Sequence, residues 1–327
     1  MSTPSHLLTP QERALLATIA YTDQFSYPLT REELTERFLS APSMKKKAIS
    51  HLSLKMSLQR LLQGGDIESA QHNTVEYFFL PGQLQSVTAR LYSAELAQTK
   101  LGEAKMVAAL LARIPWVDAV YLTGSLAMGA AEVDSDIDFL VVTQPDRLWI
   151  VRFLTGLFAQ LNGRRRSWNH EEPGSWCFNL WLDSSHLEVE QRSQDAYRAY
   201  EVLQAKILWT RSGEDVLKMH NSWIQDFFPL LKVNTSAKKF SRLRQKTGSL
   251  VFSLFLDKVE QGAWKIQTWY MRNHQTTERV GKGYAFFHPR DTAADIFQGW
   301  TSSLSRTLPK TVVMEILHPY VDTDALA

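Results

Sequence analysis

The sequence predicts an α+β protein, and three observations lead to that class. The region 1–82 carries helix-start signals followed by a hairpin, the region 83–192 alternates strands with helices, and the region 193–327 shows only helical signals. A chain of 327 residues is too long for one small core. We therefore expect these three regions to form two or three folding units.

The amino-acid composition restricts the classes of protein to which the chain can belong. Hydrophobic residues make up 44% of the chain and charged residues 21%, as in soluble globular proteins. The single cysteine, Cys177, excludes an intramolecular disulfide and any zinc site with two thiolate ligands. The N-terminus lacks the basic and apolar stretches of a signal peptide, and the apolar segment 249–256 is too short to span a membrane. These features predict a cytoplasmic protein with no membrane partner.

The region 1–82 has the element order of a winged helix. Thr9 with Glu12, and Thr30 with Glu33, have the form of capping boxes that start two helices. A third helix is expected over 51–63, where Gly64 and Gly65 end it. Two strand-like runs, 66–70 and 75–80, then follow as a hairpin. Three helices and a hairpin make a winged-helix-like domain.

The region 83–192 predicts a small mixed sheet. A connector helix is expected over 86–113, before strands at 116–122 and 136–143. A helix at 147–161 leads to a third strand at 176–182. Strand, loop, strand, helix and strand within so short a stretch indicate a compact α/β arrangement.

Two carboxylates at the start of the second strand carry the chemistry. Asp136 and Asp138 project to the same side of a strand, because side chains on a strand alternate between its faces. Two carboxylates this close repel each other unless a cation lies between them, and hard oxygen ligands suit Mg²⁺. Upstream, Gly124 and Ser125 follow an apolar strand, where glycine allows close backbone approach and serine can hold a phosphate.

Each half of this pattern, taken alone, is usually structural and not functional. A Gly-Ser pair after a strand is usually a turn, and an Asp-x-Asp is usually a solvated loop or a cap. Here Asp136 and Asp138 begin an otherwise apolar strand, a short distance from the loop at Gly124 and Ser125. Partly burying an unpaired carboxylate costs several kcal/mol, so a core would not hold two without compensation. The combination favours a functional site.

The same residues resemble a known signature. Gly124-Ser125, a spacer of ten residues and Asp136-Ile137-Asp138 before an apolar strand are similar to the DNA polymerase beta-like nucleotidyltransferase superfamily. The residues between them resemble small prokaryotic nucleotidyltransferase-domain proteins of that superfamily. The resemblance covers about residues 120–142.

The resemblance implies roles for these residues. Ser125 would contact phosphate, Gly124 would form its turn, and Asp136 and Asp138 would bind two Mg²⁺ ions, for which Mn²⁺ is a possible substitute. The metals would align an acceptor oxygen with the α-phosphate of a nucleoside triphosphate, and pyrophosphate would leave. The acceptor, whether a small molecule, a protein or an RNA, is not indicated.

The superfamily also implies a third carboxylate on a neighbouring strand, and this sequence departs from that pattern. No acid occurs inside the strand at 176–182. Asp183 at its end is the first candidate and is predicted as a catalytic residue, with Glu188 second. Asn179 is the alternative occupant of the usual position.

Two surfaces are candidates for nucleic acid. The segment 232–246 contains lysines and arginines and no acid, which suits a polyanion or equally a solvated helix face. The third helix of the winged-helix-like domain carries Lys55, Gln59 and Arg60 on its polar side, where they would face a DNA groove. Many winged helices bind proteins instead, so a DNA or a protein partner remains open.

Two functions follow. The leading hypothesis is a Mg-dependent nucleotidyltransferase that transfers a nucleoside monophosphate to an acceptor hydroxyl by a two-metal mechanism. The alternative is a catalytically weak or inactive regulator or antitoxin-like protein, which binds nucleotide together with a protein or DNA partner. The absence of an acid inside the third strand favours the alternative.

Overall fold

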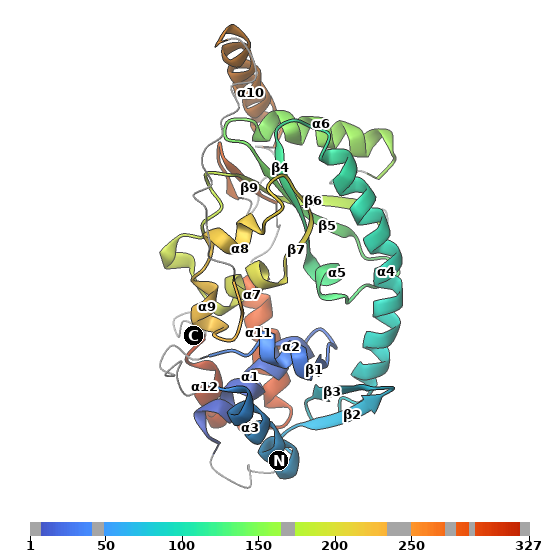
Figure 1. Ribbon diagram of the computed structural model, residues 1–327, viewed down its shortest axis with the longest axis vertical. Coiled ribbons are helices and arrows are strands. Elements are labelled where there is room, and N and C mark those ends of the chain that lie inside the picture. Colours follow the sequence, from blue (N-terminus) through green and yellow to red (C-terminus); the bar gives the residue numbers. More distant parts are fainter. Residues whose placement is uncertain are drawn as a thin grey trace.

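The computed structural model describes residues 8–40, 49–164, 174–233, 250–271, 279–287 and 292–320. In Figure 1, the N-terminal elements lie at one end of the molecule and the larger sheet lies toward the other, with the long helix α4 running between them. Among the described residues, no helix combines the length and the hydropathy needed to cross a membrane.

The N-terminal unit contains the three helices and the hairpin that the sequence predicts, and one further strand. Thr9, Thr30 and Ser50 each accept a hydrogen bond at the start of a helix, and the first two form the expected capping boxes with Glu12 and Glu33. The added strand β1 pairs with β3, so the sheet order is β1-β3-β2. The elements are α1 (Pro10–Asp23), β1 (Leu29–Thr30), α2 (Arg31–Glu36), α3 (His51–Gly64), β2 (Glu68–His72) and β3 (Val75–Phe79).

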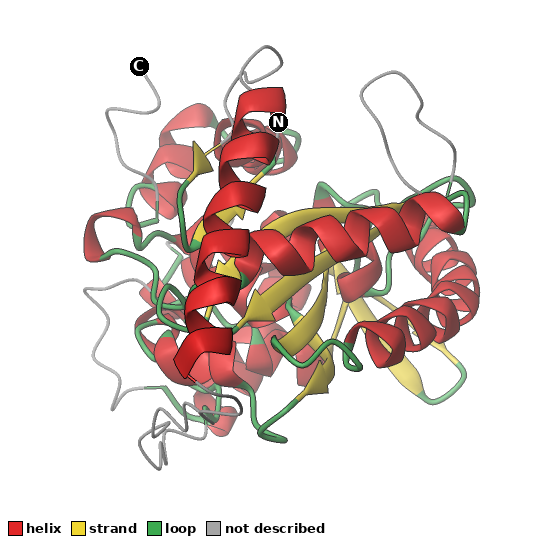
Figure 2. Ribbon diagram, turned by 90° about the horizontal axis from the view of Figure 1, so that it is seen from above, coloured by secondary structure: helices red, strands yellow, loops and turns green. Residues whose placement is uncertain are grey.

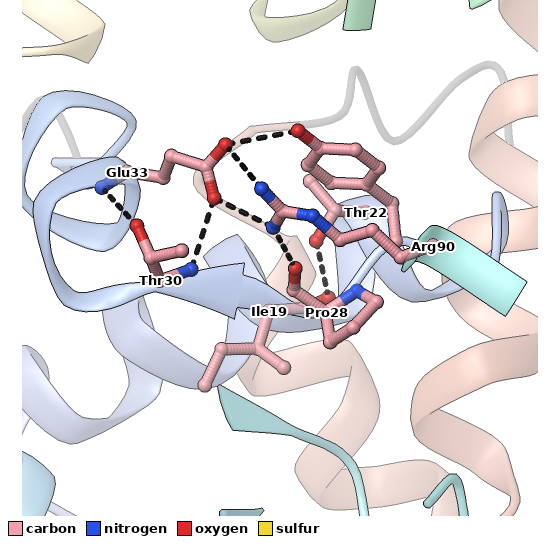
Figure 3. A network of polar contacts seen from close by, with 7 residues as sticks. Ile19, Thr22, Pro28, Thr30, Glu33 and Arg90 are labelled. Atoms are coloured by element: carbon pink, nitrogen blue, oxygen red, sulfur yellow. Dashed lines mark hydrogen bonds and ion pairs between the residues drawn. The ribbon is translucent and has the colours of Figure 1, made fainter. Parts of the chain in front are cut away.

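The connector helix α4 (Gln85–Leu111) fastens this unit to the sheet. Arg90 donates to both carboxylate oxygens of Glu33, at 2.7 and 2.9 Å, and also to the carbonyl of Pro28 (Figure 3). Burial alone would raise the pKa of Glu33, but the hydrogen bonds and charge of Arg90 lower it below its ordinary value. This half-buried ion pair fixes the first turns of α4 against β1 and α2.

The larger sheet has six strands in the order β7-β4-β5-β6-β9-β8. Only β5 and β6 are parallel neighbours, so the sheet is mixed, as the sequence predicts. Its central elements are β4 (Val117–Thr123), α5 (Gly124–Met128), β5 (Ile137–Thr143), α6 (Leu148–Leu161) and β6 (Trp176–Asp183). Helices pack around these strands, as the view in Figure 2 shows.

The prediction of a wholly helical C-terminal region is wrong. After α7, the chain forms β7 on one side of the sheet, and β8 and β9 extend the other side. Strands of two to five residues are too short to show a period of alternation, so their partners decide their conformation. The elements are η2 (Gln191–Ser193), α7 (Ala196–Gln204), β7 (Lys206–Thr210), α8 (Val216–His220), α9 (Ile224–Phe227), α10 (Leu250–Met271), β8 (Arg279–Val280), β9 (Tyr284–Phe286), α11 (Thr292–Ser305) and α12 (Lys310–Leu317).

Two apolar cores lie on opposite faces of the sheet. One core joins the face bearing Leu140 to α7, to the N-terminal unit and to α11 and α12. Within it the rings of Tyr21 and Tyr200 stack at 3.6 Å, and Trp300 donates to the carbonyl of Ala17. The other core joins the face bearing Phe139 to α4 and α6. The N-terminal unit, α7 and the end of the chain therefore share one interior.

Candidate active site

The chain turns directly from β4 into α5, and the first two residues of α5 are exposed. All seven residues of β4 are buried, whereas Gly124 and Ser125 are exposed. Gly124 has a φ of +67°, which residues with a side chain rarely adopt. A Cβ atom at this position would lie 2.5 Å from Oδ2 of Asp138. Glycine is therefore required both by the turn and by the closeness of the carboxylate.

Asp136 and Asp138 lie on the face of the sheet that β5 presents to α7. Ile137 and Phe139, which alternate with them, enter the core on the α4 and α6 side. Both acids are half-buried. Asp136 immediately precedes β5, and its Oδ1 accepts from the backbone N–H of Ser175 at 3.1 Å. The two carboxylates are thus held at one end of β5, beside the Gly124 turn.

A lysine of α4 positions the loop that leads to this pair. Nζ of Lys100 donates to the carbonyl of Val133 at 2.9 Å and to Oγ of Ser135 at 3.1 Å. Burial lowers the pKa of Lys100, against the charges of Asp134 and Asp136, which raise it. Lys100 therefore anchors the segment immediately before Asp136.

On the neighbouring strand β6, the amide side chain of Asn179 contacts Asp138. Asp138 is opposite Cys177, and a register shift follows, so that Asn179 also reaches the pair. Nδ2 of Asn179 donates to Oδ1 of Asp138 at 3.2 Å, and its Oδ1 accepts from Sγ of Cys177 at 2.9 Å. The alternative raised from the sequence, that Asn179 stands where the third acid was expected, fits this geometry.

The structure does not bring Asp183 to the pair. Asp183 is opposite Thr143, five positions along β5 from Asp138, or about 16 Å at the rise of a strand. It is 4% exposed and accepts from the backbone and hydroxyl of Ser185 at 2.9 and 2.6 Å, and it contacts Nδ1 of His186 at 2.7 Å. The choice of Asp183 as a catalytic residue is thus corrected, because the parallel register places it at the opposite end of the strand. Glu188, beyond it, is exposed.

Another carboxylate, which the sequence did not single out, belongs to α7, a helix that packs against α5 and is within electrostatic reach of Asp138. Burial and then the charge of Asp138 raise the pKa of Glu201 to about 7. Its helix packs through Ala199 and Tyr200 into the same core as Leu140 of β5. In the sequence, Glu201 is marked only by its place between Tyr200 and Val202 in a predicted helix. That pattern is too common to identify a site.

The residues present fit one Mg²⁺ ion more directly than two. Among the described residues, no three His, Cys, Asp or Glu side chains gather closely enough to hold a metal ion. Mg²⁺ commonly takes one or two carboxylates and completes its shell with water and substrate phosphates. Asp136 and Asp138, with the carboxylate of Asp138 directly against the backbone of Gly124, match that donor set.

The predicted polyanion segment 232–246 lies almost entirely outside the described residues. Lys232, which is described, is exposed.

The comparison with known protein families identifies the same part of the chain as the sheet geometry does. Residues 104–202 match the nucleotidyltransferase domain family, a range that includes β4, α5, β5, α6, β6 and most of α7. The chain therefore contains a nucleotidyltransferase domain. No curated protein matches the chain, and no solved structure matches it.

Proposed function

We propose that this chain transfers a nucleoside monophosphate from a nucleoside triphosphate to an acceptor hydroxyl. The observation that carries the proposal is the closeness of the two halves of the signature: the backbone of Gly124 lies so near the Asp138 carboxylate that no Cβ atom fits between them. A phosphate at the exposed Ser125 is thereby next to the groups that would hold its metal ion.

The reaction forms one P–O bond and breaks another. The acceptor oxygen attacks the α-phosphorus, and pyrophosphate leaves with the oxygen that bridged the α- and β-phosphates. Asp136 and Asp138 would hold magnesium, which supplies positive charge to the phosphate oxygens; we propose a second ion only if substrate phosphates provide its remaining ligands. Ser125 and the backbone of the turn hold the triphosphate.

The proton of the acceptor hydroxyl needs a base, and we assign that role to Glu201. A carboxylate with a pKa of about 7 is a stronger base than an ordinary glutamate and is still substantially ionised at neutral pH. It belongs to α7, which packs against α5 and shares the core on the face of β5 that bears Leu140. Asn179 orients Asp138 through its amide and carries no charge of its own.

The test is label transfer from each α-labelled nucleoside triphosphate, with Mg²⁺ or Mn²⁺, to protein, RNA and small-molecule acceptors. Transfer by the natural chain and its loss in Asp138→Asn would support the proposal. Circular dichroism of the variant supplies the control for folding. No transfer with any nucleotide and either metal would contradict it.

The second candidate is the regulator or antitoxin-like protein that binds nucleotide without turning it over, and Asn179 is the observation that favours it. An amide in place of the third acid keeps Asp138 hydrogen-bonded and weakens a metal site. Saturable nucleotide binding by calorimetry, together with absence of transfer, would identify this function. Asn179→Asp should then introduce transfer if the amide is the cause.

We also propose that the N-terminal unit is a winged helix, on the basis of its element order and its sheet order β1-β3-β2. Its third helix would then be the recognition element. Arg60 on that helix is paired with Glu12 at 2.5 Å, and Leu52 and Met56 are exposed beside Lys55. Among the described residues of this helix, Lys55 is in no ion pair, and a surface with one such cation and two apolar side chains favours a protein partner over DNA. A salt-dependent shift of duplex DNA would contradict this choice.

A further inference from the structure

Exposed apolar side chains are concentrated on two helices. Of the seventeen large hydrophobic residues exposed in the described chain, ten lie on α6 and α10. The two helices pack against each other, and α10 projects from the end of the molecule in Figure 1. Isolated exposed apolar residues need no explanation, whereas a contiguous group of this size marks an interaction surface.

Polar contacts fix which side of α10 faces the protein. The carboxylate of Glu260 accepts from the backbone N–H groups of Trp149 and Ile150, at 2.7 and 2.8 Å, and so caps α6. About two turns further along, Gln267 donates to the carbonyl of Trp149, and about three turns along, Sδ of Met271 lies 3.7 Å from the guanidinium of Arg152. These contacts define the inner face of α10 and leave the opposite face toward solvent.

The outer face carries a row that we call the α10 seam: Phe255, Val259, Gly262, Ile266 and Trp269. Its residues follow one another at steps of four, three, four and three, which is the spacing of a coiled-coil seam. Phe255 is 59% exposed, Ile266 68% and Trp269 71%. A Cβ at Gly262 would have no atom within 4 Å, so a neighbouring helix can approach closely there.

Two lysines beside the α10 seam indicate which kind of helix can bind there. Lys258 and Lys265 each precede a seam residue and flank the same side of the row, and both are exposed. Within the described part of the chain, no ion pair involves either of them. An antiparallel second copy of this helix would bring Lys258 toward the partner copy's equivalent of Lys265, and like charges at these positions disfavour pairing.

We propose that the α10 seam binds an amphipathic helix of another protein, whose apolar residues have heptad spacing and whose flank carries carboxylates. The surface is separate from the proposed catalytic site. The helix α6 covers the face of the sheet that bears Phe139, whereas Asp136 and Asp138 project from the other face. A helix bound to the seam therefore leaves the nucleotide site open.

The probe is a synthetic three-heptad helical peptide with leucine in its apolar seam and glutamate on its flanks, used at a concentration where it is monomeric. A second peptide carries lysine instead of glutamate. Fluorescence anisotropy with the full chain should show binding of the glutamate peptide at least about tenfold tighter than the lysine peptide, with the difference reduced by salt.

Three variants locate the binding. Ile266→Ser combined with Trp269→Ser should weaken the glutamate peptide about tenfold or more, because it removes two exposed apolar contacts without opening the core. Lys258→Glu combined with Lys265→Glu should reverse the preference between the peptides. Tyr92→Ser, which removes an equally exposed aromatic residue from α4, should change nothing and serves as the matched control.

Several results would overturn the proposal. One is equal affinity for both peptides, or binding unaffected by the seam variants. Another is a dimer of the natural chain in sedimentation that dissociates on Ile266→Ser, which would assign the seam to a second copy. Binding of phosphatidylserine vesicles that the same variant abolishes would assign it to a membrane surface.

Discussion

The two ends of the paired strands β5 and β6 each hold buried or half-buried acid, and they differ in how that acid is satisfied. Asp183 at one end accepts several hydrogen bonds from Ser185 and His186, its near neighbours in sequence. At the other end, Asp136 accepts from the backbone of Ser175 and Asp138 from the amide of Asn179, while the charge of Asp138 acts on Glu201. The first arrangement closes a loop, while the second leaves repulsion that a cation can relieve. An acidic side chain at the end of a strand therefore does not by itself distinguish a functional site from a residue that only caps a loop.

The largest effect expected from this comparison is on turnover. Asp138→Asn should lower nucleotidyl transfer by at least about a hundredfold, because it removes a charge that the proposed mechanism needs while nearly preserving volume. The rate is measured by label transfer at saturating nucleotide. Unaltered transfer would place the reactive groups elsewhere in the molecule.

Gly124→Ala tests whether the approach of the turn to Asp138 matters beyond backbone strain. Alanine at a φ of +67° costs about 1–2 kcal/mol, and its Cβ also collides with Oδ2 of Asp138. Transfer should fall about tenfold or more, since the carboxylate must move.

Gly65→Ala is its matched control. Gly65 has a φ of +74° with no atom within 4 Å of the added Cβ, so urea titration should show a similar loss of stability. Equal loss of transfer in both variants would attribute the effect to folding alone.

Asp183→Ala examines the other end of the strands. The substitution deletes the hydrogen bonds that Ser185 and His186 make to a charged acceptor, and the free energy of unfolding should fall by about 1–3 kcal/mol. Transfer per folded molecule should remain as in the natural chain. A loss as deep as that of Asp138→Asn would restore Asp183 as a catalytic residue.

The smallest effect concerns pH. The pKa of Glu201 in the folded chain is about 7, above its ordinary 4.5. Between these values the folded state binds more protons than the unfolded state, so the natural chain loses stability as pH rises from about 4.5 to about 7. Glu201→Gln removes this dependence. With a chelator present, its Tm should exceed that of the natural chain at pH 8, and the excess should disappear near pH 4.

Transfer supplies a second readout of the same variant. Activity of the natural chain should rise through about pH 7 as Glu201 ionises, and Glu201→Gln should be slower and lack this rise. Parallel pH profiles in the two proteins would remove Glu201 from the proton transfer.

Predictions from sequence succeeded where the signal is local. The capping boxes at Thr9 and Thr30 and the strand that begins after Asp136 were all placed within a few residues. The strand itself begins at Ile137, so that Asp136 precedes it and only Asp138 of the two acids lies on it. The sequence does not define how β6 aligns with β5, and for this reason it predicted Asp183 beside Asp138. In the structure, the register shift near Asn179 brings the amide of Asn179 to Asp138 instead.

By itself, the sequence determined the helix starts, the Gly124-Ser125 turn at the end of β4 and the position of the two acids at the start of β5, since each depends on residues that are neighbours along the chain. Only the tertiary structure decided which group completes the pair, that Glu201 reaches it from α7, and that β7, β8 and β9 join the sheet. These features depend on strand register and on packing between distant segments. No local preference of a few residues specifies either of them.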